Sequence, residues 1–267
     1  MIKITANQVK ELRNITGIGI MECKKALIET KGNIKLAINY IRKYLKIQSV
    51  KKSIFVAKEG FIIDLIKDDY GILLEINCQT DFVAKDINLN NFAKDILKYS
   101  FKKKITNIIE IKNIFEEKRI QLIGILKENI IINRLSIIKG NFIGKYLHHS
   151  KRIGVLVQSN INNLLLIKQI AMHIAVLKPK YISKQDVPEK IIQDEYKLQM
   201  EIAKQLNKPF NIIEKIVKGR VDKFINNITL INQKFLFDTN NTVLQFLNKN
   251  NIFISKFIRF ELGEKLL

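Results

Sequence analysis

Tryptophan is absent from this 267-residue chain, which has only two cysteines, three prolines and eleven glycines. So few prolines and glycines exclude a loop-dominated or low-complexity chain. Cys23 and Cys78 fall inside helical and strand patterns without metal-ligand spacing, so we expect small buried side chains in a reducing compartment. No uninterrupted run of about 18 apolar residues exists, and the N-terminus has neither a secretory core nor a transit segment. We therefore expect a cytoplasmic protein without a membrane span.

Residue arrangements that perform covalent catalysis are missing as well. The sequence shows no Ser/His/Asp or Cys/His arrangement, no glycine-rich phosphate loop and no metal-ligand cluster. Hydrolase and transferase functions are therefore disfavoured, and we expect no catalytic residue, no bound metal and no cofactor.

Charge is strongly unbalanced, with 46 basic against 25 acidic residues and a formal net charge of +21. One interpretation is an acidic partner, which makes a nucleic-acid-binding or ribosome-binding protein the alternative function. The other is a solvated surface rich in lysine through A/T-rich codon usage. The lysines are scattered, and no basic motif with interleaved aromatic residues is visible along the chain. We therefore expect no direct nucleic-acid role.

The first 45 residues carry the pattern of three short helices. Thr5 to Gln8 fits a capping box, Gly17 and Gly19 interrupt the first helix, and Asn33 caps the third. A Lys-rich, weakly patterned stretch at 46–58 is typical of a linker.

A strand–strand–helix pattern then occurs twice, which predicts an α+β fold with two related subdomains. The first copy has strands at 61–65 and 71–78, then helices at 91–99 and 108–126 and a strand at 129–138. The second has strands at 142–148 and 153–158 and a helix at 164–177. A short helix at 243–248 and a strand at 252–262 close the chain.

Residues 189–228 interrupt the second copy with two amphipathic helical runs separated by Asn207, Lys208 and Pro209. This pattern predicts an antiparallel helical hairpin with an apolar seam. The seam is expected to contain these residues: Ile192, Tyr196, Ala203, Leu206, Ile213, Val217, Phe224 and Ile228. Two helices cover such a seam poorly, so we expect it to pack on a partner or on a second copy.

The segment Thr80 to Asp86 directly follows a predicted strand and places an apolar ring, Phe82, beside a carboxylate, Asp81. Two interpretations are open. Phe82 is either a wedge presented to a partner, or an ordinary core residue, with Thr80 or Asp81 merely capping a short helix.

Two long motifs resemble signatures of the bacterial elongation factor Ts family. They are LRNITGIGIMECKKAL at residues 12–27 and NCQTDFVAK at residues 77–85. The runs RIGVLV at 152–157 and AMHIA at 171–175, before Lys178 and Pro179, agree in order and spacing. The resemblance covers essentially the whole chain, although Glu22 stands where an Asp is more usual. Many members continue into a further C-terminal helix, whereas this sequence ends at Leu267, so we expect a smaller interface.

The resemblance implies a ubiquitin-associated-like (UBA-like) three-helix module, a core of two α+β halves, and a helical hairpin inserted in the second half. With the patterns above, it predicts these boundaries: module 1–45, linker 46–58, N-subdomain 59–140, C-subdomain 141–184 and 229–267, and coiled-coil hairpin 185–228.

The resemblance also implies guanine nucleotide exchange on elongation factor Tu, the GTPase that delivers aminoacyl-tRNA, without covalent chemistry. It assigns the intrusion near the Mg²⁺ site to residues 80–83, which are Thr80, Asp81, Phe82 and Val83. His148 matches a position thought to press on the phosphate-loop side of the GTPase, and Arg13 and Met21 are expected to dock the N-terminal module. Met21 is equally compatible with the core. His173, on an apolar helix face, is expected to be structural.

Overall fold

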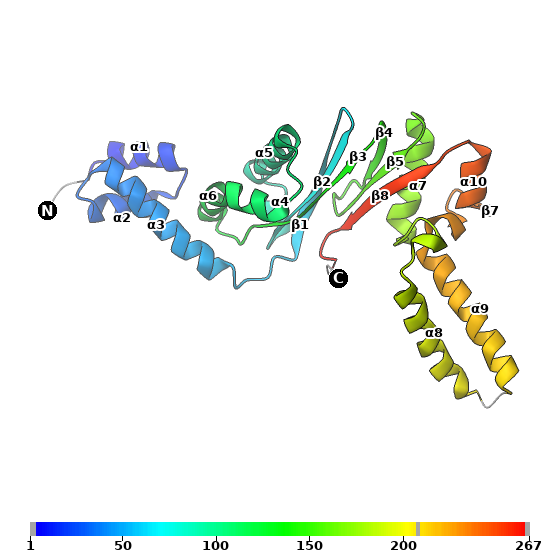
Figure 1. Cartoon of the computed structure of the whole chain (residues 1–267). Coiled ribbons are helices and arrows are strands. Elements are labelled where there is room, and N and C mark those ends of the chain that lie inside the picture. The colour runs from blue at the N-terminus through cyan, green and yellow to red at the C-terminus, as the bar shows by residue number, and fades with distance from the viewer. Residues whose placement is uncertain (1–3, 207–208, 265–267) are drawn as a thin grey trace.

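The computed structural model describes residues 4–206 and 209–264 and has an α+β fold arranged in layers (Figure 1). Two three-stranded antiparallel sheets pack face to face, and helices cover their outer faces. The first sheet has the order β1-β2-β3, and the second has the order β4-β5-β8. The strands of the two sheets are β1 (Glu59–Lys67), β2 (Tyr70–Cys78), β3 (Ile131–Lys139), β4 (Phe142–Leu147), β5 (Ile153–Ser159) and β8 (Ile254–Glu261).

The first sheet buries its outer face under helices α5 (Ile87–Lys103) and α6 (Ile108–Leu126). Alternate residues of β2, Ile72, Leu74 and Ile76, point into this core together with Phe92 and Phe115 from the helices. Both predicted strands of the first hairpin are confirmed, in register from Glu59 opposite Cys78 to Lys67 opposite Tyr70.

The second sheet buries its outer face under α7 (Leu164–Leu177) and α10 (Val243–Lys249). The helix predicted over 164–177 is confirmed at both ends, and Lys178 ends it in the left-handed conformation. Between α9 and α10 lies a small two-stranded sheet of β6 (Lys234–Phe235) and β7 (Asp238–Thr242).

The inner faces of the two sheets meet in a separate apolar cluster that includes Ile62, Leu73 and Leu156. Gly154 permits the close approach, because a Cβ at this position would lie 2.7 Å from Ile62 Cγ2. A buried ion pair links β3 to β2, with Arg134 Nε donating to Glu75 Oε2 at 2.7 Å.

Helices α1 (Ala6–Thr16), α2 (Ile20–Glu29) and α3 (Ile34–Lys52) pack around their own small core. The predicted capping box at Thr5 and Gln8 and the Asn33 cap are both present. The end of the third helix was predicted wrongly: it was placed within the first 45 residues, whereas α3 continues through Lys52. Leu45 and Ser49 continue the buried stripe of Ala37 and Ile41 at a spacing of four, which keeps the Lys-rich stretch helical.

Helices α8 (Glu189–Lys204) and α9 (Phe210–Ile228) lie side by side and form an arm that projects from the second sheet (Figure 1). Ala203, Ile213 and Val217 are buried in its seam as predicted, together with Val221 and Ile225. Tyr196 and Leu206, also predicted for the seam, are exposed. Asn207 and Lys208 lie outside the described residues.

Both cysteines are buried and free, as predicted. Burial raises the pKa of the Cys78 thiol to about 12, and it also raises the pKa of the Cys23 thiol. Neither thiol therefore supplies a thiolate at neutral pH. No helix in the described ranges is long and apolar enough to cross a bilayer.

His173 is a structural residue, as predicted. It is fully buried on α7, its Nδ1 accepts from the Leu236 N–H at 3.2 Å, and its Nε2 lies 2.9 Å from Gln233 Oε1. Burial lowers the pKa of His173. A proton on Nδ1 would face the Leu236 N–H, so this environment holds the neutral ring.

Stability should therefore fall as the pH drops below about 6.5, the ordinary histidine pKa, because the unfolded chain then binds a proton that the folded chain excludes. One such proton gives a slope of at most about 1.4 kcal/mol per pH unit. The free energy of unfolding, measured by urea denaturation between pH 7.5 and 5, should show this slope, and His173→Gln should remove it. An equal slope in the variant would contradict the assignment to His173.

Candidate functional site

The predicted site segment forms a single helical turn, α4 (Asp81–Ala84), at the end of β2. Thr80 is its N-cap, and Thr80 Oγ1 accepts from the Val83 N–H at 3.4 Å. Asp86 caps the next helix at once by accepting from the Asn88 and Leu89 N–H groups. Helix α4 is thus fixed between two caps within seven residues, Thr80 to Asp86.

A carboxylate from a distant segment clamps the start of this turn. Glu128 Oε2 accepts from the N–H groups of Gln79 and Thr80 at 3.0 Å each, and Thr80 Oγ1 donates to Glu128 Oε1 at 2.6 Å. Charge-assisted hydrogen bonds of this kind are roughly twice as strong as neutral ones. Sequence reasoning missed Glu128, and its only local signal is a polar residue between the end of α6 and a strand.

Phe82 is exposed over 81% of its surface, which excludes the interpretation as a core residue. Val83 and Ala84 do the packing instead, against the core under the first sheet. The capping part of the other interpretation is correct, because Thr80 does cap the turn. An anchored backbone therefore presents an apolar ring to solvent.

Asp81 is exposed beside Phe82 and forms an ion pair with Lys85, with Lys85 Nζ 2.9 Å from Asp81 Oδ2. The hydrogen bond from Lys85 lowers the pKa of the Asp81 carboxyl group. The carboxylate is therefore ionised at neutral pH, and it needs only to release an exposed lysine to accept another partner.

The turn between β4 and β5 lies close to this segment. A hollow of ≈ 420 Å³ separates them, lined by Asp81, Ala84 and Lys85 on one side and by His149, Ser150 and Arg152 on the other. The turn is held to the first sheet by the Ile62 N–H, which donates to the Lys151 carbonyl at 2.7 Å, and by an ion pair between Arg152 and Glu59.

His148 begins this turn and is half-buried. Its Nδ1 lies 2.7 Å from Ser150 Oγ, and its ring packs 4.1 Å from the ring of His149. The structure thus brings His148 and the Asp81–Phe82 turn to the same end of the two sheets, although they are far apart in the sequence.

Arg13 and Met21 lie apart from this end, on the N-terminal helices. Met21 is 72% exposed, so it is a surface residue and not part of the core. Arg13 lines a hollow of ≈ 560 Å³ between α1 and α2, together with the apolar side chains of Val9 and Ile20.

Contacts with α6 hold helices α1 to α3 against the helices that cover the first sheet. A Cβ at Gly124 would overlap Leu45 Cδ2, and Lys127 Nζ lies 2.7 Å from Glu22 Oε1. The hydrogen bond from Lys127 lowers the pKa of Glu22. Because Glu128 follows Lys127 directly, the same segment contacts both α2 and the Thr80 turn.

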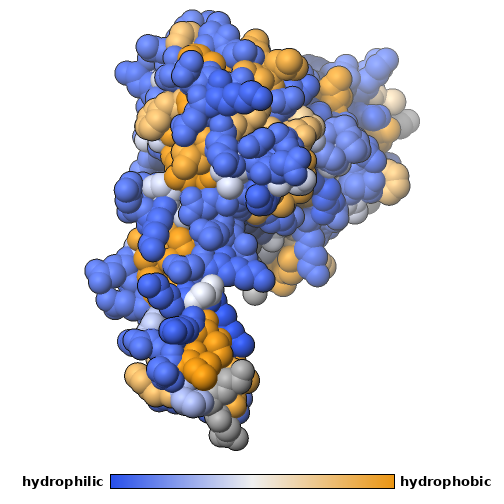
Figure 2. Space-filling model, turned by 90° about the vertical axis from the view of Figure 1, so that its right-hand side faces the viewer, coloured by the Kyte–Doolittle hydropathy of each residue, from blue (hydrophilic) through white to orange (hydrophobic). Residues whose placement is uncertain are grey.

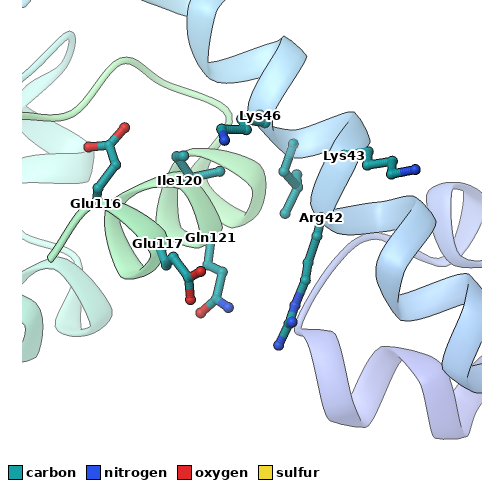
Figure 3. A pocket seen from close by; sticks show the side chains of 8 residues that line it. Arg42, Lys43, Lys46, Glu116, Glu117, Ile120 and Gln121 are labelled. Atoms are coloured by element: carbon teal, nitrogen blue, oxygen red, sulfur yellow. The ribbon is translucent and has the colours of Figure 1, made fainter. Parts of the chain in front are cut away.

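A further hollow of ≈ 260 Å³ lies between α3 and α6 and contains none of the predicted site residues. Figure 3 shows Arg42, Lys43 and Lys46 on one helix and Glu116, Glu117, Ile120 and Gln121 on the other. Glu116 is already paired with Arg119 through two hydrogen bonds of 2.7 Å. Within the described ranges, no group of three metal-ligating side chains is present.

Comparison with known proteins gives the family. Residues 79–264 match the sequence model of the family described as Elongation factor TS. The chain belongs to the elongation factor Ts family. It is 47% identical to elongation factor Ts of Baumannia cicadellinicola, over 99% of this chain and 95% of the relative. It is 46% identical to the Cronobacter sakazakii protein and 45% identical to one from Escherichia coli, in each case over 99% of this chain and 93% of the relative.

The Glu128 clamp predicts a measurable local effect. Glu128→Ala removes three hydrogen bonds, so the amide protons of Gln79 and Thr80 should exchange with solvent at least about ten-fold faster, because an unpaired polar group costs about 1–3 kcal/mol. Hydrogen exchange followed by NMR measures this. The matched control is Glu117→Ala, an exposed position on α6. Unchanged protection in Glu128→Ala would show that the caps alone hold the turn.

Proposed function

We propose that this chain is a guanine nucleotide exchange factor for elongation factor Tu in translation elongation. The family membership supports the function, and the observation that carries it is the exposed Phe82 ring on an anchored turn. Exchange requires no bond to be made, which agrees with a protein proposed to have no catalytic residues and no cofactor.

The physics of exchange sets what the site must do. The factor must bind the nucleotide-free GTPase more tightly than the GDP-bound form, and by linkage GDP then weakens binding of the factor by the same ratio. A surface with equal affinity for both states would leave the equilibrium unchanged. The site must therefore contact a feature that differs between the two states.

A rigid ring and an ionised carboxylate suit this requirement. Phe82 is proposed to insert between packed elements of the GTPase near its Mg²⁺ site, where Asp81 rearranges the polar network that holds the ion. Thr80 fixes the backbone through its bonds to Glu128, and Val83 fixes it by packing. A mobile loop would lose ordering entropy on insertion, whereas the clamped turn has already lost it.

His148 lies in the β4–β5 turn, and a hollow separates this turn from Asp81. From this turn, His148 is proposed to contact the phosphate-loop side of the GTPase. Arg13 and Met21 are proposed to dock the UBA-like module formed by α1 to α3 on the same partner. In this arrangement the docking residues provide affinity, and the Phe82 turn provides the difference between nucleotide states.

The two roles can be separated by the release of fluorescent GDP from elongation factor Tu at increasing factor concentration. Phe82→Ala should lower the maximal release rate by at least about ten-fold, the size of effect that removal of a central aromatic contact has at an interface. Its melting temperature should barely change, because the ring contributes little to the core. Arg13→Ala and Met21→Ala should raise the concentration for half-maximal release and leave the maximal rate intact.

Ile109→Ala is the matched control, since Ile109 is an apolar side chain of α6 with 65% exposure. Normal exchange by Phe82→Ala, or a large loss of its stability, would refute the wedge. The absence of any stimulated GDP release by the unmodified protein would refute the proposed function itself.

The arm of α8 and α9 is proposed to be the inserted helical hairpin and to carry a homodimer contact. Figure 2 shows an apolar patch near the end of the arm. Exposed apolar side chains of the arm include Leu198, Ile202 and Phe210. An exposed apolar patch of this kind marks an interaction surface, and a second copy of the chain would remove it from solvent.

Sedimentation equilibrium tests this contact. The unmodified protein should reach the mass of two chains at micromolar concentration, and Leu198→Gln with Phe210→Gln should reduce it to one. A single-chain mass for the unmodified protein over the same concentrations would exclude the homodimer.

A further inference from the structure

The ends of the two sheets that face away from Phe82 form a second polar and basic surface. Strand β2 runs from Tyr70 at this end to Cys78 at the Phe82 end. Nine residues of strand separate the two surfaces by about 26 Å. In Figure 1 this end lies at the top, where the β1–β2 hairpin projects, and α4 lies lower down.

Lysines and aromatic rings from three separate segments meet here. The rings of Tyr70 and Phe101 lie edge to face with centroids 6.2 Å apart. Lys104 Nζ lies 3.4 Å from the Tyr70 centroid and 4.6 Å from that of Phe101. Lys67 lies 5.3 Å from the Phe101 ring, and Lys139 lies 5.6 Å from the Tyr70 ring. Cation–π contacts therefore hold three ammonium groups close together.

Positive charge is poorly compensated at this cluster. Lys102 and Lys103 add two exposed cations at the end of α5. In the part of the chain that the structure describes, only Lys139 of these five lysines has a carboxylate within 4.0 Å, the Asp69 group at 3.7 Å. Asp68 is the other acidic residue of the turn. Unpaired ammonium groups in a cluster are the arrangement that binds successive phosphates.

An uncharged hollow of ≈ 280 Å³ adjoins the cluster. Gly140, which follows Lys139 of the cluster, lines the hollow, and its N–H donates to the Asp69 carbonyl at 2.9 Å. Asn141 and Gln158 supply amide side chains to its wall, and no hydrogen bond of either side chain occurs within the described residues. Lys256, exposed on β8, is opposite Gln158 in the strand register.

Phe253 forms part of this hollow and is 66% exposed. Its backbone is fixed by Asn160, since the Phe253 N–H donates to Asn160 Oδ1 at 2.7 Å and the Asn160 N–H donates to the Phe253 carbonyl at 3.2 Å. A fixed backbone thus presents an exposed ring beside the amide groups of Asn141 and Gln158.

We propose that this end of the two sheets binds a single-stranded nucleic acid. The proposal departs from the expectation drawn from the sequence, because the lysines and rings that meet here come from segments that are distant along the chain. The lysines contact successive phosphates, Phe253 stacks on a base, and Asn141 and Gln158 hydrogen-bond to base edges. A single strand fits better than a duplex, because the face of a base is available for stacking only when it is unpaired. This interaction is separate from the proposed exchange function and uses none of its residues.

Fluorescence anisotropy of a labelled oligouridylate of about 12 nucleotides tests the proposal. The fourfold variant Lys67→Gln, Lys102→Gln, Lys103→Gln and Lys104→Gln should weaken binding at least about ten-fold. It should also reduce the slope of log K against log salt by about 3, since each phosphate contact to a single strand contributes about 0.7. Phe253→Ala should weaken binding about five-fold or more and leave that slope unchanged.

The matched charge control replaces four exposed lysines of the arm with glutamine: Lys197, Lys215, Lys218 and Lys223. Phe55→Ala is the control for an exposed ring outside the hollow. Equal weakening by the controls would show diffuse attraction to the net charge and overturn the proposal. So would tighter binding to a duplex of the same length or to anionic phospholipid vesicles. A parallel oligothymidylate titration distinguishes RNA from DNA, and an unchanged melting temperature of the fourfold variant confirms that it is folded.

Discussion

The burial of both faces of β2 is the constraint on which the rest of this structure depends. Leu74 and Ile76 point toward α5 and α6, while Leu73 points toward the second sheet. A strand covered on both sides cannot shift its register by one residue without exchanging its two apolar faces. The position of Thr80, two residues after the end of this strand, is therefore fixed relative to both sheets. The turn that carries Phe82 is therefore fixed in position as well.

The second sheet supplies the other half of the candidate site through the same packing. Gly154 allows β5 to approach Ile62 and Leu73 closely, and the preceding turn is held to β1 by the Lys151 carbonyl. His148 and Asp81 consequently lie at one end of the molecule, and the lysine cluster and the Phe253 hollow lie at the other.

Stability and the proposed function make opposite demands at Phe82. Burying such a ring would stabilise the fold by roughly 2 kcal/mol, so its exposure gives up a gain that the nearby core could have provided. Val83 and Ala84 take up the packing instead, and Glu128 compensates with three hydrogen bonds. The proposed role of Phe82 in recognition rests on this exposed ring and on the anchored turn that carries it.

The sequence by itself determined the elements, because helix and strand periodicity, the Thr5 capping box and the Asn33 cap are local signals. Its motifs also gave the family. It misplaced the end of α3, since lysines concealed the stripe completed by Leu45 and Ser49, and it left Met21 and Phe82 undecided between core and surface. Exposure depends on which residues fill the space nearby, and only tertiary packing determines that. The Glu128 clamp and the lysine cluster around Tyr70 and Phe101 join segments that are distant along the chain, so no local pattern contains them.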